Sequence, residues 1–335
     1  MRIGCGGLKD SVDGSPSSSP ASLYARVEEG PSFRSTKLAA MGERATGPRP
    51  AAPPSLDLAA RVRLGHARIA YVMEEAELRG LHVKGYAAEP GVYRGRRSSS
   101  DVDLLVHPSD AAAAVELLAS HGWAPVADFS EGSIFEHAAT LWHDHLGYVD
   151  VHRLFPGLGT DAARTFDALW AERTTRVIAG RPVPVPGPVH QRLVVIVHAA
   201  RDSHRGALDV RHLRDTSTPA EWDALRQEAR RLHATAAWHV ATGEDADGMD
   251  AHDLALFEAL QNDESGLDLF RTRWRTARSA RERARLVLHT LPVNRPHLQM
   301  RLGHAPTRAD LRREQRTRMA SLARWAWTRG VRRGR

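Results

Sequence analysis

Two aspartates in one short apolar segment are the residues of this chain whose types and spacing best suit metal chemistry. The segment Asp101–Val106 reads DVDLLV, and its apolar residues predict a buried strand. Side chains two apart on a strand share a face, so Asp101 and Asp103 should converge while Val102 and Leu104 turn away. Buried like charges are costly, and Mg²⁺ is held in proteins by a few carboxylates together with substrate phosphates. The pair therefore predicts a Mg²⁺ site for a phosphate-bearing substrate.

A lysine–glycine pair and an arginine precede these aspartates, and a third aspartate follows them. Lys84-Gly85 ends a short apolar run, Arg97 lies four residues before Asp101, and Asp150 stands in an apolar–Asp–apolar–His segment. This ordered set, over roughly residues 56–300, resembles the uncharacterised nucleotidyltransferase family of the polymerase-beta-like superfamily. In that family a lysine–glycine pair replaces the more usual glycine–serine. A DxD segment alone is a weak signal, and the ordered set is more specific.

The resemblance implies an α+β fold, in which a mixed sheet flanked by helices is followed by an all-helical C-terminal domain. It implies Mg²⁺-dependent transfer of a nucleoside monophosphate from an NTP, expected to be ATP, to an unidentified hydroxyl or phosphate acceptor, which could belong to a small molecule, a peptide or RNA. Three carboxylates would bind two Mg²⁺ ions and act in catalysis: Asp101, Asp103 and Asp150. Asp150 could also take the proton of the acceptor hydroxyl. Three further residues would bind the nucleotide phosphates: Lys84, Gly85 and Arg97.

Lysine is rare in this chain, which draws attention to Lys84. The formal net charge is +7, and the only lysines are Lys9, Lys37 and Lys84, so nearly all positive charge is arginine. Lys84 is the one lysine in the part expected to fold. An ammonium is a compact point charge suited to phosphate, although a chance lysine at a strand end is the simpler interpretation. We expect Lys84 to contact a triphosphate oxygen and to contribute little to stability.

Histidines near Asp150 allow a second interpretation, a zinc or iron site. Its ligands would come from His143, Asp144, His145, Asp150 and His152. His143 and His145 flank a predicted turn, so strand pairing would have to bring them to His152. The alternative is that His152 orients Asp150 or contacts phosphate.

The elements that must position these residues are expected in a core over 56–186. Its predicted elements are helices over 58–79, 110–121 (with Ser109 as the N-cap) and 161–173, strands over 81–83, 101–106 and 123–129, a hairpin over 138–152 with its turn at 144–147, and a hairpin across Gly180. If the second arm of the first hairpin lies beside the strand 101–106, the three carboxylates meet.

After Pro186 the pattern is helical only, so we place a domain boundary there. Helices are expected over 189–201, 218–240, 251–261, 267–290 and 307–328, and Thr218 and Glu221 form a capping box. His198 is predicted to be a core histidine. Arg211 and Asp215 could line the acceptor side of the cleft or merely pair. The predicted division is 1–55 disordered, 56–186 nucleotidyltransferase core, 187–305 helical domain and 306–335 basic tail.

Composition narrows the class of protein. A single cysteine, Cys5, excludes an internal disulfide framework and suits a reducing cytoplasm, and the sequence has no long apolar run or signal peptide, so no membrane segment is expected. A monomer is the working expectation. Met41 offers an alternative start. Two other classes stay open: a catalytically silent, antitoxin-like module of the same fold, and an RNA-binding protein that uses the arginine-rich tail with Trp325 and Trp327.

Overall fold

The computed structural model describes residues 56–95, 99–129, 135–202, 206–261, 266–277, 279–290, 293, 298 and 307–333. The segment predicted to be disordered, residues 1–55, therefore lies outside the described residues. None of the helices in the described ranges is long and apolar enough to cross a bilayer.

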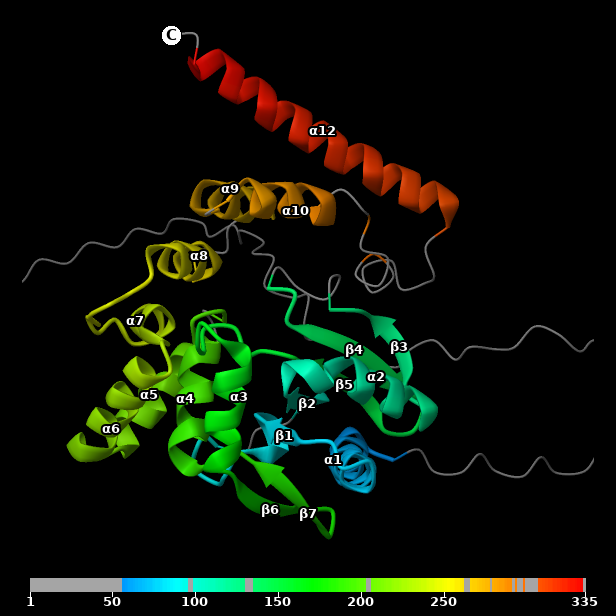
Figure 1. Cartoon of the computed structure of the whole chain (residues 1–335), viewed down its shortest axis with the longest axis vertical. Coiled ribbons are helices and arrows are strands. Elements are labelled where there is room, and N and C mark those ends of the chain that lie inside the picture. Colours follow the sequence, from blue (N-terminus) through cyan, green and yellow to red (C-terminus); the bar gives the residue numbers. More distant parts are fainter. Residues whose placement is uncertain are drawn as a thin grey trace, which may run out of the picture. The chain divides into compact units, whose positions relative to one another are not determined.

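A five-stranded mixed sheet forms the centre of the fold (Figure 1). Its strands are β1 (Gly80–Val83), β2 (Asp101–Val106), β3 (Ala124–Ala127), β4 (Ala138–His143) and β5 (Gly147–His152), in the order β1-β2-β5-β4-β3. The pair β2 and β5 is parallel, and the other three pairs are antiparallel. The predicted hairpin over 138–152 is confirmed as β4 and β5, and its second arm does lie beside the DVDLLV strand.

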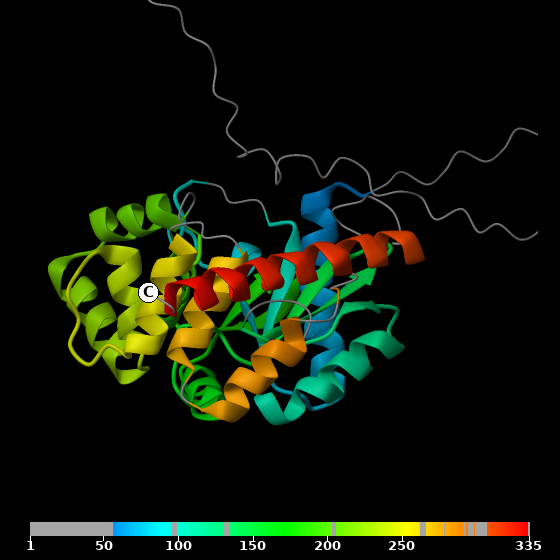
Figure 2. The same ribbon diagram turned by 90° about the horizontal axis from the view of Figure 1, so that it is seen from above.

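One face of the sheet packs against α1 (Leu58–Glu75) and α2 (Ala111–Ser120), which lie together on that side (Figure 2). Apolar residues at helical spacing in α1, including Ile69 and Val72, meet Val102 and Leu104 of β2 in this core. The Asp57 side chain accepts a hydrogen bond from the Ala60 amide and so begins α1. Because strand side chains alternate, this packing turns the aspartates of β2 to the opposite face.

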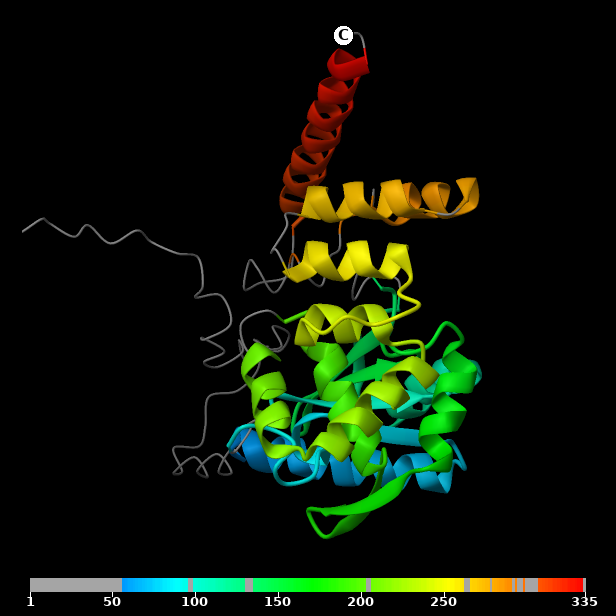
Figure 3. The same ribbon diagram turned by 90° about the vertical axis from the view of Figure 1, so that its left-hand side faces the viewer.

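The opposite face is covered by helices that follow in the chain (Figure 3). They are α3 (Ala162–Ala171), α4 (Pro188–Ala199), α5 (Gly206–Thr216), α6 (Pro219–Arg231), α7 (Thr235–Thr242) and α8 (Ala251–Gln261). A single apolar cluster joins Leu81 and Leu105 of the sheet to Val195 of α4 and Trp238 of α7. The helices after Pro186 thus form part of the wall around the polar face of β2 and β5.

The strands of the described residues all precede Pro186, and the second hairpin is confirmed as β6 (Thr174–Ile178) and β7 (Arg181–Val185). The α+β architecture with a helical C-terminal region is therefore confirmed. The division into a core and a separate helical domain at Pro186 stays a prediction, because the cluster that contains Leu81 and Val195 crosses that boundary.

Several predicted helix ends are wrong. Ser109 does not cap α2; it lies in a 3₁₀ turn, Pro108–Asp110, where the His107 ring accepts from its amide. The helix expected over 218–240 begins with the predicted capping box but divides into α6 and α7 at His233, whose φ is +49°. The helix expected over 267–290 divides into α9 (Gly266–Thr276) and α10 (Ala280–Thr290), with Ser279 directly before α10. The last helix, α12, is longer than expected (Arg308–Arg333).

Candidate active site

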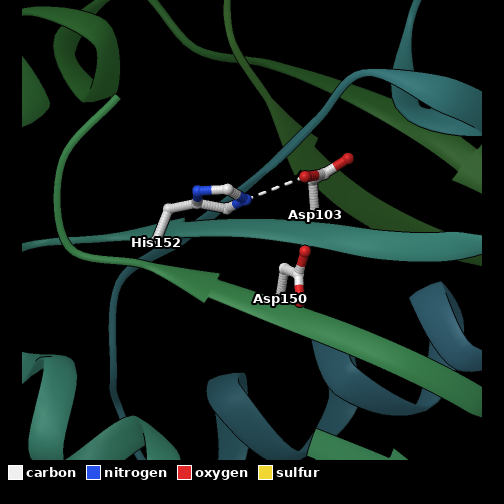
Figure 4. Close-up of side chains that lie close together, drawn as sticks. All are labelled: Asp103, Asp150 and His152. Carbon is white, nitrogen blue, oxygen red and sulfur yellow. Dashed lines mark hydrogen bonds and ion pairs between the residues drawn. The ribbon is translucent and has the colours of Figure 1, made fainter. Parts of the chain in front are cut away.

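The three predicted carboxylates lie on adjacent parallel strands. Asp101 and Asp103 are on β2, Asp150 is on β5, and Asp103 pairs in register with Asp150. One oxygen of Asp103, one oxygen of Asp150 and one ring nitrogen of His152 all lie within 4.8 Å of one another (Figure 4). The predicted convergence of Asp103 and Asp150 is thus present in the structure, and it arises because parallel in-register pairing places both on one face.

Two of these carboxylates are poorly compensated. Burial, with added repulsion from Asp103 and Asp150, raises the pKa of Asp101 to about 6. Burial also raises the pKa of Asp150, and the negative charge of Asp103 adds to this effect. Ionised buried carboxylates in such proximity indicate a deficit of positive charge at this point of the sheet.

Asp103 is the exception, because two donors meet on one of its oxygens. The Lys84 ammonium and the His152 Nε2 each lie 2.8 Å from Asp103 Oδ1. Burial alone would raise the pKa of Asp103, but Lys84 and His152 hold it well below the ordinary value. His152 therefore orients Asp103 and not Asp150, which corrects the sequence-based expectation.

Asp150 has a different partner that the sequence did not indicate. The Thr140 hydroxyl donates a 2.6 Å hydrogen bond to Asp150 Oδ1, from the position directly opposite on β4. No local pattern marks Thr140, because its role depends on the register of the hairpin. This bond fixes one oxygen of Asp150.

The lysine–glycine pair forms a strained turn at the end of β1. Lys84 has φ +59° and ψ −173°, a region that essentially only glycine occupies, at a cost of about 1–3 kcal/mol for other residues. Gly85 follows with φ +47°, and a Cβ there would lie 2.7 Å from the Ser99 Oγ, so a larger residue would be strained and would have to displace Ser99. Ser99 in turn donates to the Asp101 carbonyl oxygen at 2.8 Å. The turn that delivers Lys84 is therefore locked to the start of β2.

The predicted phosphate-binding Arg97 lies outside the described residues. Arg201, which the sequence analysis missed, lies at the same face of the sheet: its charge acts on Asp103 and on His137. The His137 ring is 5.1 Å from the His152 ring, and burial, with the positive charges nearby, lowers its pKa to about 2. Neither residue belongs to a recognisable motif.

The zinc or iron site is not assembled as predicted. His143 pairs in register with Gly147 and Ala138 with His152, so His143 and His152 stand at opposite ends of β4 and β5, about 17 Å apart at 3.4 Å per residue. The His143 ring packs instead on Trp123, with 4.8 Å between centroids.

The helical residues singled out from the sequence also differ from expectation. His198 is half-buried and so is not fully enclosed in the core. Arg211 and Asp215 are both exposed on α5, and no ion pair joins them among the described residues.

The donor set fits Mg²⁺. Mg²⁺ prefers hard oxygen ligands and retains several waters, so a few carboxylates suffice to hold it. Asp101, Asp103 and Asp150 supply such oxygens from one face, and the raised pKa values of Asp101 and Asp150 show that a cation would relieve their repulsion. The nearest imidazole, His152, already directs Nε2 to Asp103.

Comparison with solved structures finds low-identity likenesses. The lincosamide antibiotic adenylyltransferase LnuA, in a lincomycin-bound crystal structure, is 15% identical with a TM-score of 0.33, over 46% of this chain and 96% of that one. The antibiotic-resistance factor ANT(2'')-Ia, in solution, is 15% identical with a TM-score of 0.36, over 53% and 95%. An antigenic nucleotidyltransferase-like protein from Paracoccidioides brasiliensis is 17% identical with a TM-score of 0.34, over 55% and 98%. Because all three TM-scores are below 0.5, these likenesses carry no functional argument.

A family profile gives the decisive comparison. No curated protein sequence matches the chain. The profile described as "Uncharacterised nucleotidyltransferase" matches residues 58–243, more than half of the chain. The matched range includes the Lys84-Gly85 turn, the three carboxylates and Arg201, and it ends with α7. The chain therefore belongs to the uncharacterised nucleotidyltransferase family.

Proposed function

We propose that this protein transfers a nucleoside monophosphate from an NTP, expected to be ATP, to a hydroxyl or phosphate acceptor, with Mg²⁺ as cofactor. The observation that carries this proposal is the in-register pairing of Asp103 with Asp150, with Asp101 two residues away on the same strand. Crowded carboxylates whose pKa values are raised need positive charge, which Mg²⁺ would provide while it also binds the triphosphate.

Each protein group has a role that follows from its contacts. Mg²⁺ held by the three carboxylates would lower the pKa of the acceptor hydroxyl and offset the charge of the triphosphate. Asp150 is the proposed proton acceptor, because its carboxylate lies beside Asp103, where Mg²⁺ would hold the acceptor hydroxyl. Thr140 and His152 hold Asp150 and Asp103 in place through single hydrogen bonds of 2.6 and 2.8 Å. Lys84 would neutralise charge on the phosphates as well as on Asp103.

The test is to incubate the full chain with Mg²⁺, ATP labelled at the α-phosphate, and either a small-molecule extract or RNA. We expect a labelled product, identified by mass spectrometry, whose formation falls by at least about 10²-fold in Asp103→Asn. Asp167→Asn is the matched control, because Asp167 pairs with Arg79 on the surface and not with the site. Binding of ATP without any product would favour a catalytically silent module.

One observation favours RNA as a second candidate partner. Residues 308–335 contain ten arginines and two acidic residues, whereas the whole chain has a net charge of only +7. Excess positive charge therefore lies almost wholly in α12 and its end, where Arg308, Arg312 and Arg316 are exposed at i, i+4 spacing. If RNA binds by this helix, affinity should fall steeply with salt and disappear on removal of residues 305–335, while ATP binding remains.

A further inference from the structure

Arg201 is fixed against the polar face of the sheet by aromatic rings. Its guanidinium carbon lies 5.6 Å from the centroid of Phe135 and 5.3 Å from the centroid of Phe155. Phe135 stacks on Phe257 of α8 with 5.9 Å between centroids, and Gln261 of α8 donates to the Ala199 carbonyl oxygen at the end of α4. Such ring contacts position the guanidinium but accept no hydrogen bond from the edge of its plane, so its N–H groups need other acceptors.

In the part of the chain that the structure describes, no carboxylate lies at ion-pair distance from Arg201. Among the described residues Arg201 takes part in no ion pair, and its Nε is buried without a hydrogen-bond partner. Burial lowers the pKa of Arg201 to about 10, against the opposing charge of Asp103, so the group is still a cation at neutral pH. Arg201 is partly buried, and charges withdrawn from water in folded proteins are usually paired, so its unsatisfied buried Nε points to a missing anion.

The position of Arg201 indicates which anion it would take. The Lys84 ammonium lies 5.9 Å from the centroid of Phe155, so Lys84 and Arg201 both stand over this one ring. Asp103 is the carboxylate whose charge acts on Arg201. Asp150, by contrast, is the residue proposed to take the proton from the hydroxyl that receives the nucleotide. The two cations thus share the ring of Phe155, and the charge of Asp103 acts on Arg201; we therefore expect the nucleotide phosphates on this side of the site.

We propose that Arg201 is a second phosphate-binding cation, which contacts the triphosphate of the bound nucleotide and supplies the planar donor that Lys84 cannot. This inference rests on the proposed function. Arginine binds phosphate through parallel N–H groups, and Lys84 is already engaged with Asp103 in the free protein. The triphosphate would in turn accept from a guanidinium that otherwise remains unmatched.

The test measures binding of three probes, ATP, inorganic tripolyphosphate and AMP, by titration calorimetry in Mg²⁺. Arg201→Met should weaken the binding of ATP and of tripolyphosphate by about 10- to 100-fold, as expected for loss of a charge-assisted hydrogen bond. The affinity for AMP should stay unchanged. Arg201→Lys should recover part of the loss. The control is Arg192→Met on α4, because Arg192 lies 3.6 Å from Glu221 of α6 and so has an ion-pair partner outside the site; it should bind all three probes as the wild type does.

Thermal unfolding separates this role from a structural one. Without ligand, Arg201→Met should unfold at the same or a higher temperature, because an apolar side chain of similar length replaces a partly buried charge that has no ion-pair partner among the described residues. With ATP, its gain in unfolding temperature should be smaller than that of the wild type. A lower unfolding temperature without ligand, together with equal loss for ATP and AMP, would mean that Arg201 is structural and would overturn the inference.

Two results separate the inference from the proposed function. Wild-type affinity of Arg201→Met for tripolyphosphate, with nucleotidyl transfer intact, would overturn the role of Arg201 alone. Failure of the wild-type protein to bind ATP or tripolyphosphate in Mg²⁺ would overturn the proposed function and the inference with it.

Discussion

Replacing Lys84 by alanine, glycine and arginine tests the charge and the backbone of one residue separately. The Lys84 ammonium lies 2.8 Å from Asp103, and the two side chains are only 15% and 8% exposed. Removing one partner of a buried pair leaves the other uncompensated, which costs about 3–5 kcal/mol. Because His152 still donates to Asp103, we expect the lower end, about 3 kcal/mol, for Lys84→Ala. The contact with Asp103 therefore argues against the expectation from the sequence that Lys84 matters little for stability, and unfolding of Lys84→Ala decides between them.

The backbone of Lys84 works in the opposite direction. At φ +59° and ψ −173° any residue with a Cβ is strained by about 1–3 kcal/mol, and glycine is not. Glycine also loses more conformational entropy on folding, by about 0.4–1 kcal/mol relative to alanine. Lys84→Gly should therefore be more stable than Lys84→Ala by about 1 kcal/mol, although both lack the ammonium.

Activity should follow the charge and not the stability. We expect nucleotidyl transfer to fall by about 10²–10³-fold in both Lys84→Ala and Lys84→Gly, the effect of losing one preorganised donor. Lys84→Arg should retain part of the activity, because a longer planar group cannot sit where the ammonium sat. Stability is measured by urea unfolding, and nucleotidyl transfer by the passage of the α-phosphate label from ATP into the product.

Three results would refute this reasoning. Equal stability of the alanine and glycine variants would show that the backbone strain at Lys84 does not exceed the entropy cost of glycine. Full transfer by Lys84→Gly would show that the ammonium has no role in the reaction. Full transfer by Lys84→Arg would show that any positive charge suffices at this position.

Three further outcomes are expected at other residues. Asp150→Asn should raise the unfolding temperature and abolish transfer, because it removes one of the crowded charges together with the proposed base; a lower unfolding temperature would contradict this. Gly85→Ala should lower the free energy of unfolding in urea by about 2 kcal/mol, and the second change Ser99→Gly should restore much of this loss. No recovery in the double variant would show that the 2.7 Å approach to Ser99 is not the cause. His66 is buried beside His82, and burial lowers the pKa of His66 from 6.5 to about 4. Between these pH values the unfolded chain binds a proton that the folded chain does not, so the free energy of unfolding should fall by about 3 kcal/mol as the pH drops from 6.5 to 4. Leucine at both positions should reduce this dependence of stability on pH.

Local rules account for the parts of the site that could be predicted. Alternation within DVDLLV places Asp101 and Asp103 on the face opposite Val102 and Leu104, whatever the rest of the chain does. The turn between β4 and β5 follows from polar residues between two apolar segments. The ordered motifs then led to the family that the profile confirms.

The contacts that were missed join residues far apart in the chain. Asp103 and His152 are separated by 49 positions, and their 2.8 Å contact exists because β5 pairs with β2 in parallel and in one register. His233 divides a predicted helix without any glycine or proline to announce it, because tertiary packing overrides weak local preferences.

By itself, the sequence determined the strand that carries the aspartates and the face they share. Only the tertiary structure decided which charged and polar side chains contact one another in the site. It directs Lys84 and His152 to Asp103, leaves Asp150 to Thr140, and brings Arg201 from the end of α4 to the ring of Phe155. The physical reason is that periodicity and turn chemistry act over a few residues, whereas the partner of a buried charge depends on how distant strands and helices pack.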